Sequence, residues 1–530
     1  MNILIVSFET CGNFGYHLGV DLELAEKHLR QGDAVTFLGC DGSIGACQTN
    51  KRGFQVNCTD CKLRRLDATR ELSGAVAIHS LKAPHIKRQL MALPGPLDSH
   101  TVSDYEAFKY AGHDLGLAAV SSALNIHRDP RCESEEAMLS IELFLRAACS
   151  SYEATRHFLS ENKNYDCAYI FSGRFAAQRG ALRAIQDAHI PCFTHERGNS
   201  FPYYDTYPDA LPQDLALRQK RTIEAWENSN NHEKRDKWAH QFYQEHRSGR
   251  AVAWKNYVND QLPGSLPENW DEKKHNIVIF NSSQDEMASI SEYNINTVYA
   301  SQAEALTKIT EDSLLSKKPI HFYLRIHPNL AKVTNSDMDE LLSIRSPNLT
   351  IIGGGDTIST YALLDACDCV LTFGSTMGAE ATYWGKPSVL VSPSFYDELD
   401  VAYQPTSHEE VVRLLLRDDL PPKPRLGALK YGYYRRTWGM PLEYWKPLDL
   451  WSGHFGGLFF SPDVSWLGKR YSLHNKLYLL FSSLCRNNRS LATADKFARP
   501  LCILAYKVRN VFRRARKIFK RGHNAALLGD

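Results

Sequence analysis

Short apolar runs alternate with segments of helical periodicity along much of the chain. The run at residues 2–8 (NILIVSF) predicts a buried strand, while Gly32 and the apolar run after it predict the end of a helix and a second strand. The helix between them has an apolar face made of Leu18, Leu22, Ala25 and Leu29. This order of strand, loop, helix and strand predicts the beginning of a Rossmann-like domain.

Three predicted strands in the second half of the chain lead directly into polar residues. Ser282 and Ser283 come just after the apolar run NIVIF, and Arg325 and His327 end another apolar run. Residues 371–391 (LTFGSTMGAEATYWGKPSVLV) predict a strand, a Gly-Ser-Thr turn, a short helix and a second strand. Because the carboxyl ends of parallel strands meet at one edge of a sheet, these turns predict a ligand cleft.

The residue types in these turns suit a phosphate and a ribose. Arg325 and His327 can donate to phosphate oxygens. Ser375 and Thr376 can cap the helix that follows and offer hydroxyls to an anion. Glu380 lies one turn further along the same helical face, where its carboxylate can hold a vicinal diol. The alternatives are a His327 that only closes a turn and a Glu380 that only faces solvent.

At these positions the chain resembles bacterial surface-polysaccharide glycosyltransferases of the GT-B fold. The shared motifs are R-x-H-P, here Arg325 to Pro328, and S-T-x-G-x-E-A-x-x-x-G-K-P, here Ser375 to Pro387. The group includes the Kdo transferases of capsule synthesis and is distantly similar to polyol-phosphate polymerases. The resemblance implies two Rossmann-like domains with a cleft between them, and a donor site without a catalytic metal. The donor-binding residues it implies, with the two serines of the NIVIF turn, are Arg325, His327, Ser375, Thr376, Glu380, Ser282 and Ser283.

Polar residues also follow predicted strands in the first half. Arg174 follows the run CAYIF, and Glu196 and Arg197 follow the run PCFTH. All three are expected at strand carboxyl ends, facing the acceptor side of the cleft. Similar surface-carbohydrate proteins carry a related His-Glu-Arg-Gly turn, which indicates a function for Glu196. A structural ion pair is the alternative for Glu196 and Arg197.

The loop after the first strand is the other acceptor-side candidate. It contains Gly12 and Asn13 and resembles the first turn of a GT-B acceptor domain, where glycine lets the backbone approach a ligand; a plain tight turn is the alternative. His17 ends this loop. If the enzyme inverts the sugar's configuration, Glu196, or else His17, would act as general base on the acceptor hydroxyl.

Length and composition indicate an ordinary soluble protein with more than one domain. The chain has 530 residues, of which 43% are hydrophobic and 23% charged, and a formal net charge of +2 that suggests no nucleic-acid partner. The start of the chain lacks the features of a secretory signal, and no apolar run approaches the roughly 20 residues that cross a bilayer. With 13 cysteines and no export signal, the sequence predicts reduced thiols in the cytoplasm.

The expected domain limits follow changes in composition along the chain. Residues 1–266 are expected to form the N-terminal Rossmann-like acceptor domain, which ends in a Trp- and charge-rich stretch. Residues 267–410 are expected to form the donor domain. An aromatic segment, 411–470, is expected to cross back to the first domain, and residues 471–530 are expected to form a basic tail.

Four cysteines lie in or near one predicted loop. Cys40, Cys47, Cys58 and Cys61 have the spacing C-x6-C-x10-C-x2-C, and the last pair has metal-knuckle spacing. Four thiolates could close a structural zinc site or hold an iron-sulfur cluster. Four reduced cysteines without a metal are an equal alternative, because no second C-x2-C pair completes a familiar motif.

The last part of the chain is basic and has helical periodicity. Residues 505–522 predict an amphipathic helix surrounded by Lys and Arg, which suits an anionic membrane surface. The apolar face consists of Val508, Val511, Phe512, Ala515, Ile518 and Phe519. A basic tail that only docks on the protein is the alternative.

Together these features predict an α/β glycosyltransferase of the GT-B fold, peripheral on the cytoplasmic face of a bacterial inner membrane. It would move a sugar from a nucleotide-activated donor, with CMP-linked donors slightly favoured, to a surface-polysaccharide or lipid-linked acceptor. A sugar-nucleotide epimerase of the same fold, which needs no second substrate, is one alternative. A non-catalytic polysaccharide assembly factor is the other, and the complete set of donor-site residues argues against it.

Overall fold

The computed structural model describes residues 1–10, 15–51, 53, 55–82, 100–250, 257–283, 289–290, 298–316 and 318–460. Gly12 and Asn13 lie outside the described residues, and so does the basic tail, including residues 505–522. Within the described part of the chain, no helix has the length and apolar character needed to cross a membrane.

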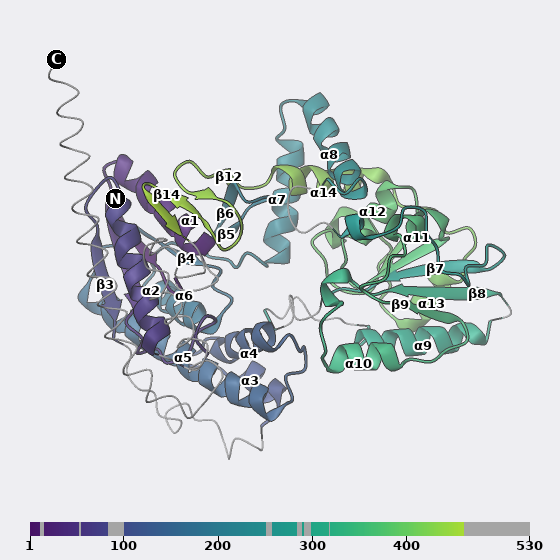
Figure 1. The fold of residues 1–530 in the computed structure, drawn as a ribbon, viewed down its shortest axis with the longest axis horizontal. Coiled ribbons are helices and arrows are strands. Elements are labelled where there is room, and N and C mark those ends of the chain that lie inside the picture. The colour runs from purple at the N-terminus through teal and green to yellow at the C-terminus, as the bar shows by residue number, and fades with distance from the viewer. Residues whose placement is uncertain are drawn as a thin grey trace, which may run out of the picture. The chain divides into compact units, whose positions relative to one another are not determined.

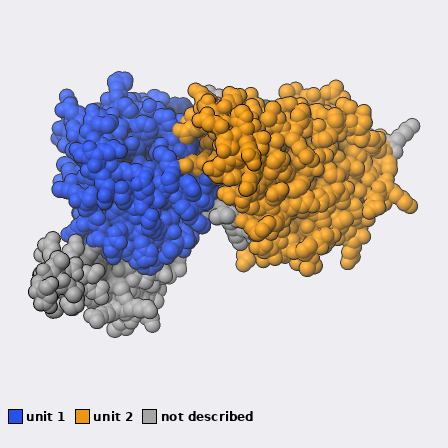
Figure 2. Space-filling view, turned by 90° about the horizontal axis from the view of Figure 1, so that it is seen from above, with its two compact units in different colours: residues 1–122, 139–212, 440–530 blue, residues 123–138, 213–439 orange. Residues whose placement is uncertain are grey.

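The chain forms two compact units (Figure 2). Unit 1 consists of residues 1–122, 139–212 and 440–530, and unit 2 of residues 123–138 and 213–439. The first 266 residues, expected to form one domain, are therefore shared between the units. The expected aromatic segment is likewise shared, because the chain leaves unit 2 at Gly439.

Unit 1 is built on a seven-stranded sheet with the order β12-β6-β5-β4-β1-β2-β3 (Figure 1). The strands from β3 through β5 are parallel, whereas β6 and β12 run antiparallel to their neighbours. The strands are β1 (Asn2–Val6), β2 (Ala34–Cys40), β3 (Ala77–Leu81), β4 (Cys167–Phe171), β5 (Cys192–Arg197), β6 (Tyr203–Pro208) and β12 (Met440–Pro441). The described helices up to residue 187 are α1 (Gly15–Arg30), α2 (Gln55–Ala68), α3 (Val102–Ala107), α4 (Leu115–His127), α5 (Glu135–Glu161) and α6 (Ala176–Asp187).

The predicted βαβ start is confirmed. Strands β1 and β2 pair in parallel, with Ile3 opposite Val35 and Ile5 opposite Phe37. Helix α1 covers them with the predicted apolar face, of which only Leu29 is partly exposed. Burial on both faces explains why the parallel strands read as nearly continuous apolar runs.

Unit 2 contains a five-stranded, wholly parallel sheet with the order β11-β10-β7-β8-β9. The strands are β7 (His275–Phe280), β8 (Ile320–Arg325), β9 (Leu349–Ile352), β10 (Cys369–Thr372) and β11 (Ser388–Leu390). The connecting helices are α9 (Gln302–Leu314), α10 (Ser336–Ser343), α11 (Thr360–Ala366), α12 (Met377–Tyr383) and α13 (His408–Leu415). The α/β class with two Rossmann-like units is thus confirmed.

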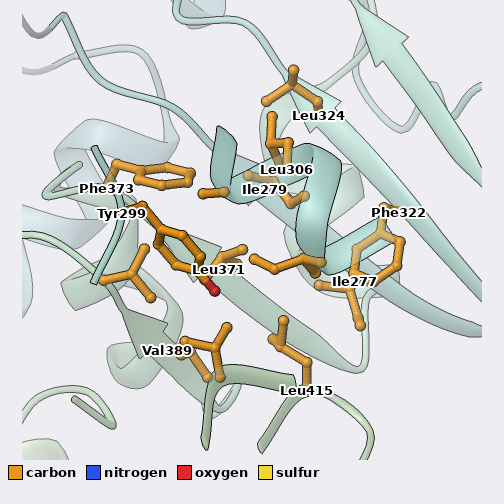
Figure 3. Close-up of a cluster of buried hydrophobic side chains, with 14 of the residues drawn as sticks. Ile277, Ile279, Tyr299, Leu306, Phe322, Leu324, Leu371, Phe373, Val389 and Leu415 are labelled. Atoms are coloured by element: carbon orange, nitrogen blue, oxygen red, sulfur yellow. The ribbon is translucent and has the colours of Figure 1, made fainter. Parts of the chain in front are cut away.

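Alternate residues of the unit 2 strands enter two separate cores. Ile277 and Ile279 of β7 point into a cluster with Phe322 and Leu371, which Figure 3 shows. Val278 and its alternate neighbours enter the cluster on the other face of the sheet. Successive side chains of a strand point to opposite faces of the sheet, and both faces are buried here. Polar side chains are therefore expected mainly at the strand ends, where the turns begin.

Three further helices belong to unit 2: α7 (Leu215–Glu227), α8 (His232–Arg247) and α14 (Arg425–Thr437). Tyr243 of α8 stacks on Tyr383 at the end of α12, with ring centroids 4.0 Å apart, and donates to the Ala428 carbonyl over 2.5 Å. Gly432 leaves the space for this ring, since a Cβ there would lie 2.6 Å from it. These aromatic contacts explain why the Trp- and charge-rich stretch packs in unit 2.

Residues Leu442, Trp445, Phe455 and Phe460 pack with α1 in the core of unit 1. The buried Glu23 carboxylate accepts hydrogen bonds from the backbone N–H groups of Glu443, Tyr444 and Trp445, over 2.7–2.9 Å. The Trp445 ring is fully buried against Gly19, where a Cβ would lie 2.3 Å from the indole. Three short strands follow: β13 (Lys446–Pro447), β14 (Gly453–Phe455) and β15 (Leu458–Phe460).

Candidate functional site

The strand order of unit 2 creates a topological switch point between β7 and β10. After β7 the chain adds β8 and β9 on one side of the sheet, then returns to add β10 and β11 on the other. The loops after β7 and β10 therefore leave the sheet in opposite directions, and ligands of open α/β sheets bind at such points. The Ser282 hydroxyl joins the two loops by donating to the Phe373 carbonyl over 2.7 Å.

Asn281, the residue directly after β7, connects this loop to the R-x-H-P turn. Its Oδ1 accepts a hydrogen bond from the backbone N–H of His327 over 2.7 Å. The side chain is buried, and its Nδ2 has no hydrogen-bond partner among the described residues. A buried amide with two unused N–H donors is costly, so this atom indicates a missing acceptor. Asn281 directly follows the apolar run NIVIF, and the sequence pattern alone does not predict this role.

His327 is held as a neutral hydrogen-bond donor. Its Nδ1 accepts from the backbone N–H of Asn329 over 3.1 Å, which places the ring proton of neutral imidazole on Nε2. Burial and the neighbouring Arg325 charge lower the pKa of His327 to about 4. The imidazole is therefore uncharged at neutral pH and offers one N–H donor.

Arg325 donates hydrogen bonds mainly to backbone carbonyls of the protein. Its guanidinium is buried, and burial lowers its pKa. It donates to the carbonyls of Gly353 and Asp356, the second over 3.0 Å, and so fixes the loop after β9. Gly354 allows this loop to pass close to the His327 carbonyl, 3.0 Å from where a Cβ would be. The structure thus gives Arg325 a positioning role in addition to its charge.

The Gly-Ser-Thr turn after β10 is closed by hydrogen bonds within unit 2. Gly374 has a φ of +91°, and the Ser375 carbonyl accepts from the Tyr396 hydroxyl over 2.6 Å. Gly378 gives Tyr396 room, since a Cβ there would lie 2.3 Å from its hydroxyl oxygen. Ser375 Oγ accepts from the Met377 N–H at 3.4 Å, whereas Thr376 makes no side-chain cap. Only one of the two expected caps is present.

Glu380 has protein partners. Its Oε2 accepts from the Tyr361 hydroxyl over 2.5 Å, and its Oε1 lies 3.4 Å from His246 Nδ1. The side chain is buried rather than facing solvent. Hydrogen bonding within the protein therefore explains the buried carboxylate without a ligand, and the ribose-holding role stays a prediction.

The other serine of the predicted donor set lies at the same edge of the sheet. Ser283 accepts from the Arg128 guanidinium over 3.4 Å. Seven residues predicted to bind the donor thus come from three consecutive strand ends of one sheet: Ser282, Ser283, Arg325, His327, Ser375, Thr376 and Glu380.

The acceptor-side candidates of unit 1 have less open surroundings. His17 is partly buried in α1 and stacks on Phe171, with ring centroids 3.3 Å apart. Burial and the neighbouring His195 hold the pKa of His17 well below its usual value. Arg174 is also buried and donates to Ser121 Oγ over 2.7 Å.

Glu196 and Arg197 do not lie in a strand-to-helix turn. They are the last two residues of β5, and β5 continues into an antiparallel hairpin in which Glu196 faces Asp205 of β6. They therefore lie at the carboxyl end of a strand, as expected, but a hairpin follows them rather than a helix. The pattern PCFTHERGN does not distinguish a hairpin from a helix crossover, because the partner strand comes later in the sequence.

Glu9, just after β1, is a polar group that the sequence analysis did not single out. It has a left-handed backbone with φ of 56°, and Ser172 after the neighbouring strand β4 has φ of 54°. Such strain in residues other than glycine is concentrated at functional sites. Glu9 Oε1 accepts from the Gln48 N–H over 2.8 Å, and burial raises its pKa to about 7. A carboxylate directly after the first apolar run was the available sequence signal.

The four candidate cysteine ligands line one cavity of about 30 Å³ together with Glu9. Their sulfurs contact protein groups: Cys61 accepts from Thr10 N–H and Cys58 from Asn50 Nδ2, each over 3.2 Å. Among the described residues, no three His, Cys, Asp or Glu side chains are grouped as metal ligands. Burial also raises the pKa of Cys40 and Cys47, which favours thiols. Metal binding stays a prediction.

Comparison with known proteins gives neighbours among solved structures. No family model matches the chain, and no curated protein matches its sequence. The chain is similar to the β-Kdo 2,4 transferase KpsC of Thermosulfurimonas dismutans, with 12% identity over 53% of this chain and 79% of that chain (TM-score 0.34). It is also similar to Acinetobacter baumannii MurG, with 11% identity over 82% and 94% (TM-score 0.25). A third neighbour is the UDP-GlcNAc 2-epimerase of Neisseria meningitidis, with 10% identity over 82% and 97% (TM-score 0.25).

Proposed function

We propose that the carboxyl edge of the unit 2 sheet binds the phosphates of a nucleotide-activated sugar, and that the chain transfers this sugar to a surface-glycan or lipid-linked acceptor. The observation that supports this best is an unsatisfied donor at the end of β7, beside the ring of His327 at the end of β8. Asn281 Nδ2 is buried and has no partner among the described residues, and the proton of neutral His327 lies on Nε2. A phosphate supplies only acceptors to such donors, so it matches them.

The proposed chemistry is stabilisation of the departing phosphate. Negative charge builds on the phosphate oxygens as the bond to the sugar breaks, and fixed N–H donors stabilise that charge without reorganisation. His327 and Asn281 would donate directly. Arg325 would add its charge from behind while holding the loop after β9 in place. Ser375 and Thr376 would add hydroxyl donors from the other side of the switch point. That this step needs no catalytic metal is a prediction.

The test replaces a donor by an acceptor without changing its shape. In Asn281→Asp, one carboxylate oxygen still accepts from the His327 N–H, while the other repels phosphate. Calorimetric titration with CMP-, UDP-, GDP- and CDP-linked sugars should show binding of at least one donor, with CMP-linked sugars tested first. Affinity in the variant should fall roughly a hundredfold or more. The matched control is Asn269→Asp, an exposed residue that contacts Thr350 near the amino end of β9.

The results of this test also separate the alternatives. Equal donor affinity in Asn281→Asp and Asn269→Asp would contradict the proposed site. If the protein converts a bound donor to an epimer with no acceptor present, its activity is epimerisation and not transfer. Tight donor binding without turnover in the presence of glycan and lipid-linked acceptors would favour an assembly factor.

Attachment to an anionic membrane on the cytoplasmic side is part of the proposal. It rests on the basic periodicity of residues 505–522, which lie outside the described residues. Each Lys or Arg near such a surface contributes about 1 kcal/mol, and the apolar face adds burial. Deleting residues 500–530 should release the protein from phosphatidylserine-containing vesicles while donor affinity stays unchanged. High salt should weaken the attachment of the full-length protein. Equal co-sedimentation of both forms would contradict the attachment.

A further inference from the structure

Arg128 reaches the carboxyl edge of the unit 2 sheet from a segment for which the sequence pattern predicts no role. It directly follows α4 and belongs to unit 2. Its Nη2 lies 3.4 Å from the hydroxyl oxygen of Ser283, just beyond Asn281, whose Nδ2 is buried without a partner among the described residues. The turn after β7 therefore has a guanidinium beside its neutral polar groups.

The backbone at Arg128 is fixed against the first turn of α10. The Arg128 carbonyl accepts from the Nδ2 group of buried Asn335 over 2.5 Å. Asn335 also caps α10, because its Oδ1 accepts from the Met338 N–H over 2.8 Å. Ser336 donates to the Asp129 carboxylate over 2.8 Å. Since α10 is the helix that follows the R-x-H-P turn, these contacts hold Arg128 at the same edge of the sheet.

A second set of contacts holds the rest of this loop. Arg131 pairs with Asp337 over 3.4 Å and with Glu340, both in α10. Cys132 is buried, and its thiol donates to the carbonyl of residue 129 over 3.2 Å. Arg128 and Cys132 both have left-handed backbones, with φ of 55° and 50°. Such strain in residues other than glycine is concentrated at functional sites.

The charge balance of the predicted donor site shows what Arg128 adds. Of the seven residues predicted to bind the donor, Arg325 has a positive formal charge, Glu380 a negative one, and His327 is uncharged at neutral pH. The formal charges of this set cancel, whereas the phosphate of a nucleotide-activated sugar is an anion. Moving an anion from water into a site is costly unless a cation pairs with it. Arg128 gives the set a net positive charge.

The two guanidinium groups at this edge have different contacts. Arg325 donates to the carbonyls of Gly353 and Asp356, so those N–H groups are used in holding the loop after β9. The contacts of Arg128 include the Ser283 hydroxyl, which accepts from the cation and keeps its own proton to donate. A planar guanidinium suits a phosphate because it offers parallel N–H donors together with its charge.

We infer that Arg128 is a ligand of the donor phosphate, pairing with its negative charge, and that the Ser283 hydroxyl donates to the same phosphate. The inference rests on the proposed function, because it adds a charged residue to the same donor site. It assigns the electrostatic part of donor recognition to Arg128, and the hydrogen bonds from neutral groups to Asn281 and His327.

The test measures nucleotide-sugar binding by the full-length protein at several salt concentrations. The ligand is whichever of the CMP-, UDP-, GDP- and CDP-linked sugars binds the natural protein most tightly in calorimetric titration. Arg128→Gln should lower its affinity roughly tenfold or more, because a hydrogen bond between charged groups is lost. The affinity of the natural protein should fall as salt rises, and the affinity of Arg128→Gln should depend less steeply on salt.

Two further variants separate a charge at this position from a charge elsewhere. Arg345→Gln removes an exposed positive charge just after α10, where Arg345 donates to the carbonyls of Leu342 and Ile344. It should leave both affinity and salt dependence unchanged. Arg128→Lys keeps the charge without the planar fork, so it should keep the salt dependence and lose less affinity than Arg128→Gln. Melting curves show whether each variant folds, and Arg128→Met, which keeps an aliphatic stem, replaces Arg128→Gln if that variant does not fold.

Each outcome has one consequence. Equal affinity and equal salt dependence in the natural protein and Arg128→Gln would overturn the inference and leave the proposed donor site intact. An equal loss in Arg345→Gln would also overturn it, because the effect of Arg128 would then be only a long-range effect of charge. A loss in Arg128→Gln with the salt dependence of the natural protein would do the same, because the residue would then only shape the loop. If the natural protein binds none of the nucleotide sugars, the proposed function itself is contradicted, and the role of Arg128 with it.

Discussion

The carboxyl edges of the two sheets show opposite hydrogen-bonding chemistry. At the unit 2 edge, Asn281 Nδ2 and Arg325 Nε are buried donors with no partner among the described residues, beside neutral His327. At the unit 1 edge, the polar group that lines a cavity is the Glu9 carboxylate, an acceptor surrounded by thiols and apolar side chains. Both edges arise from the same parallel architecture, because β1 and β7 each lead directly into a polar turn.

The parallel fold therefore fixes where a site can lie, and the turn residues fix which ligands it favours. Buried N–H donors without acceptors favour an anion, whereas a carboxylate disfavours one. Four experiments sharpen or break this comparison.

The largest expected effect is a loss of stability in unit 1 that leaves donor binding by unit 2 unchanged. Trp445→Ala empties a fully buried site on α1 and should cost about 3–5 kcal/mol of unfolding free energy, as large aromatic truncations do. Because this ring packs in unit 1, the nucleotide-sugar affinity assigned to unit 2 should be unchanged under conditions where the variant is folded. Denaturant unfolding and calorimetric titration provide the measurements. Trp451→Ala, at a ring 41% exposed, is the control and should cost much less.

The pH dependence of stability in Glu9→Gln tests whether the Glu9 carboxyl of unit 1 is buried. The folded pKa is about 7, raised from 4.5 by burial, so the folded state binds more protons between these values. Stability from this group is fully present below the lower value and is lost as pH rises through about 7. At pH 8 the Gln variant should be more stable than the natural protein by up to about 3 kcal/mol, and at pH 4 the two should be similar. Thermal melts at both pH values decide it, and a pH-independent difference would contradict the buried, raised carboxyl.

His327→Ala tests the unit 2 edge. Removing one hydrogen bond to a charged phosphate should weaken donor binding by about 1.5–3 kcal/mol. The pKa of His327 is lowered to about 4, so the natural protein loses stability as pH falls below its ordinary value of 6.5. The His327→Ala variant should not show this loss of stability at low pH. Donor affinity unaffected by the substitution would remove His327 from the site.

Glu380 gives the smallest expected effect and distinguishes a structural carboxylate from a ligand-binding one. Glu380→Gln can still accept from the Tyr361 hydroxyl, so we expect near-normal stability. Glu380→Ala leaves that buried hydroxyl unsatisfied and should cost about 1–3 kcal/mol. If Glu380 holds a ribose, both variants should also lose donor affinity; if it only positions α12, the Gln variant should bind donor normally.

Much of the local architecture could be predicted because strand and helix periodicities are local properties. The β1-α1-β2 start and the strand-turn-helix-strand unit from β10 to β11 follow directly from apolar runs, Gly and polar turn residues. The hairpin after β5 could not be predicted in the same way, because antiparallel pairing of Glu196 with Asp205 depends on contacts between separate segments.

The sequence by itself determined which residues end the strands, and therefore that Ser282, Arg325, His327 and Ser375 share one edge of a parallel sheet. Tertiary structure decided how each of these polar groups is satisfied. Packing engaged Glu380 with Tyr361, turned the Arg325 guanidinium to loop carbonyls, and left Asn281 Nδ2 without a partner among the described residues. Hydrogen-bond partners come from distant segments, so periodicity along the chain carries no information about them.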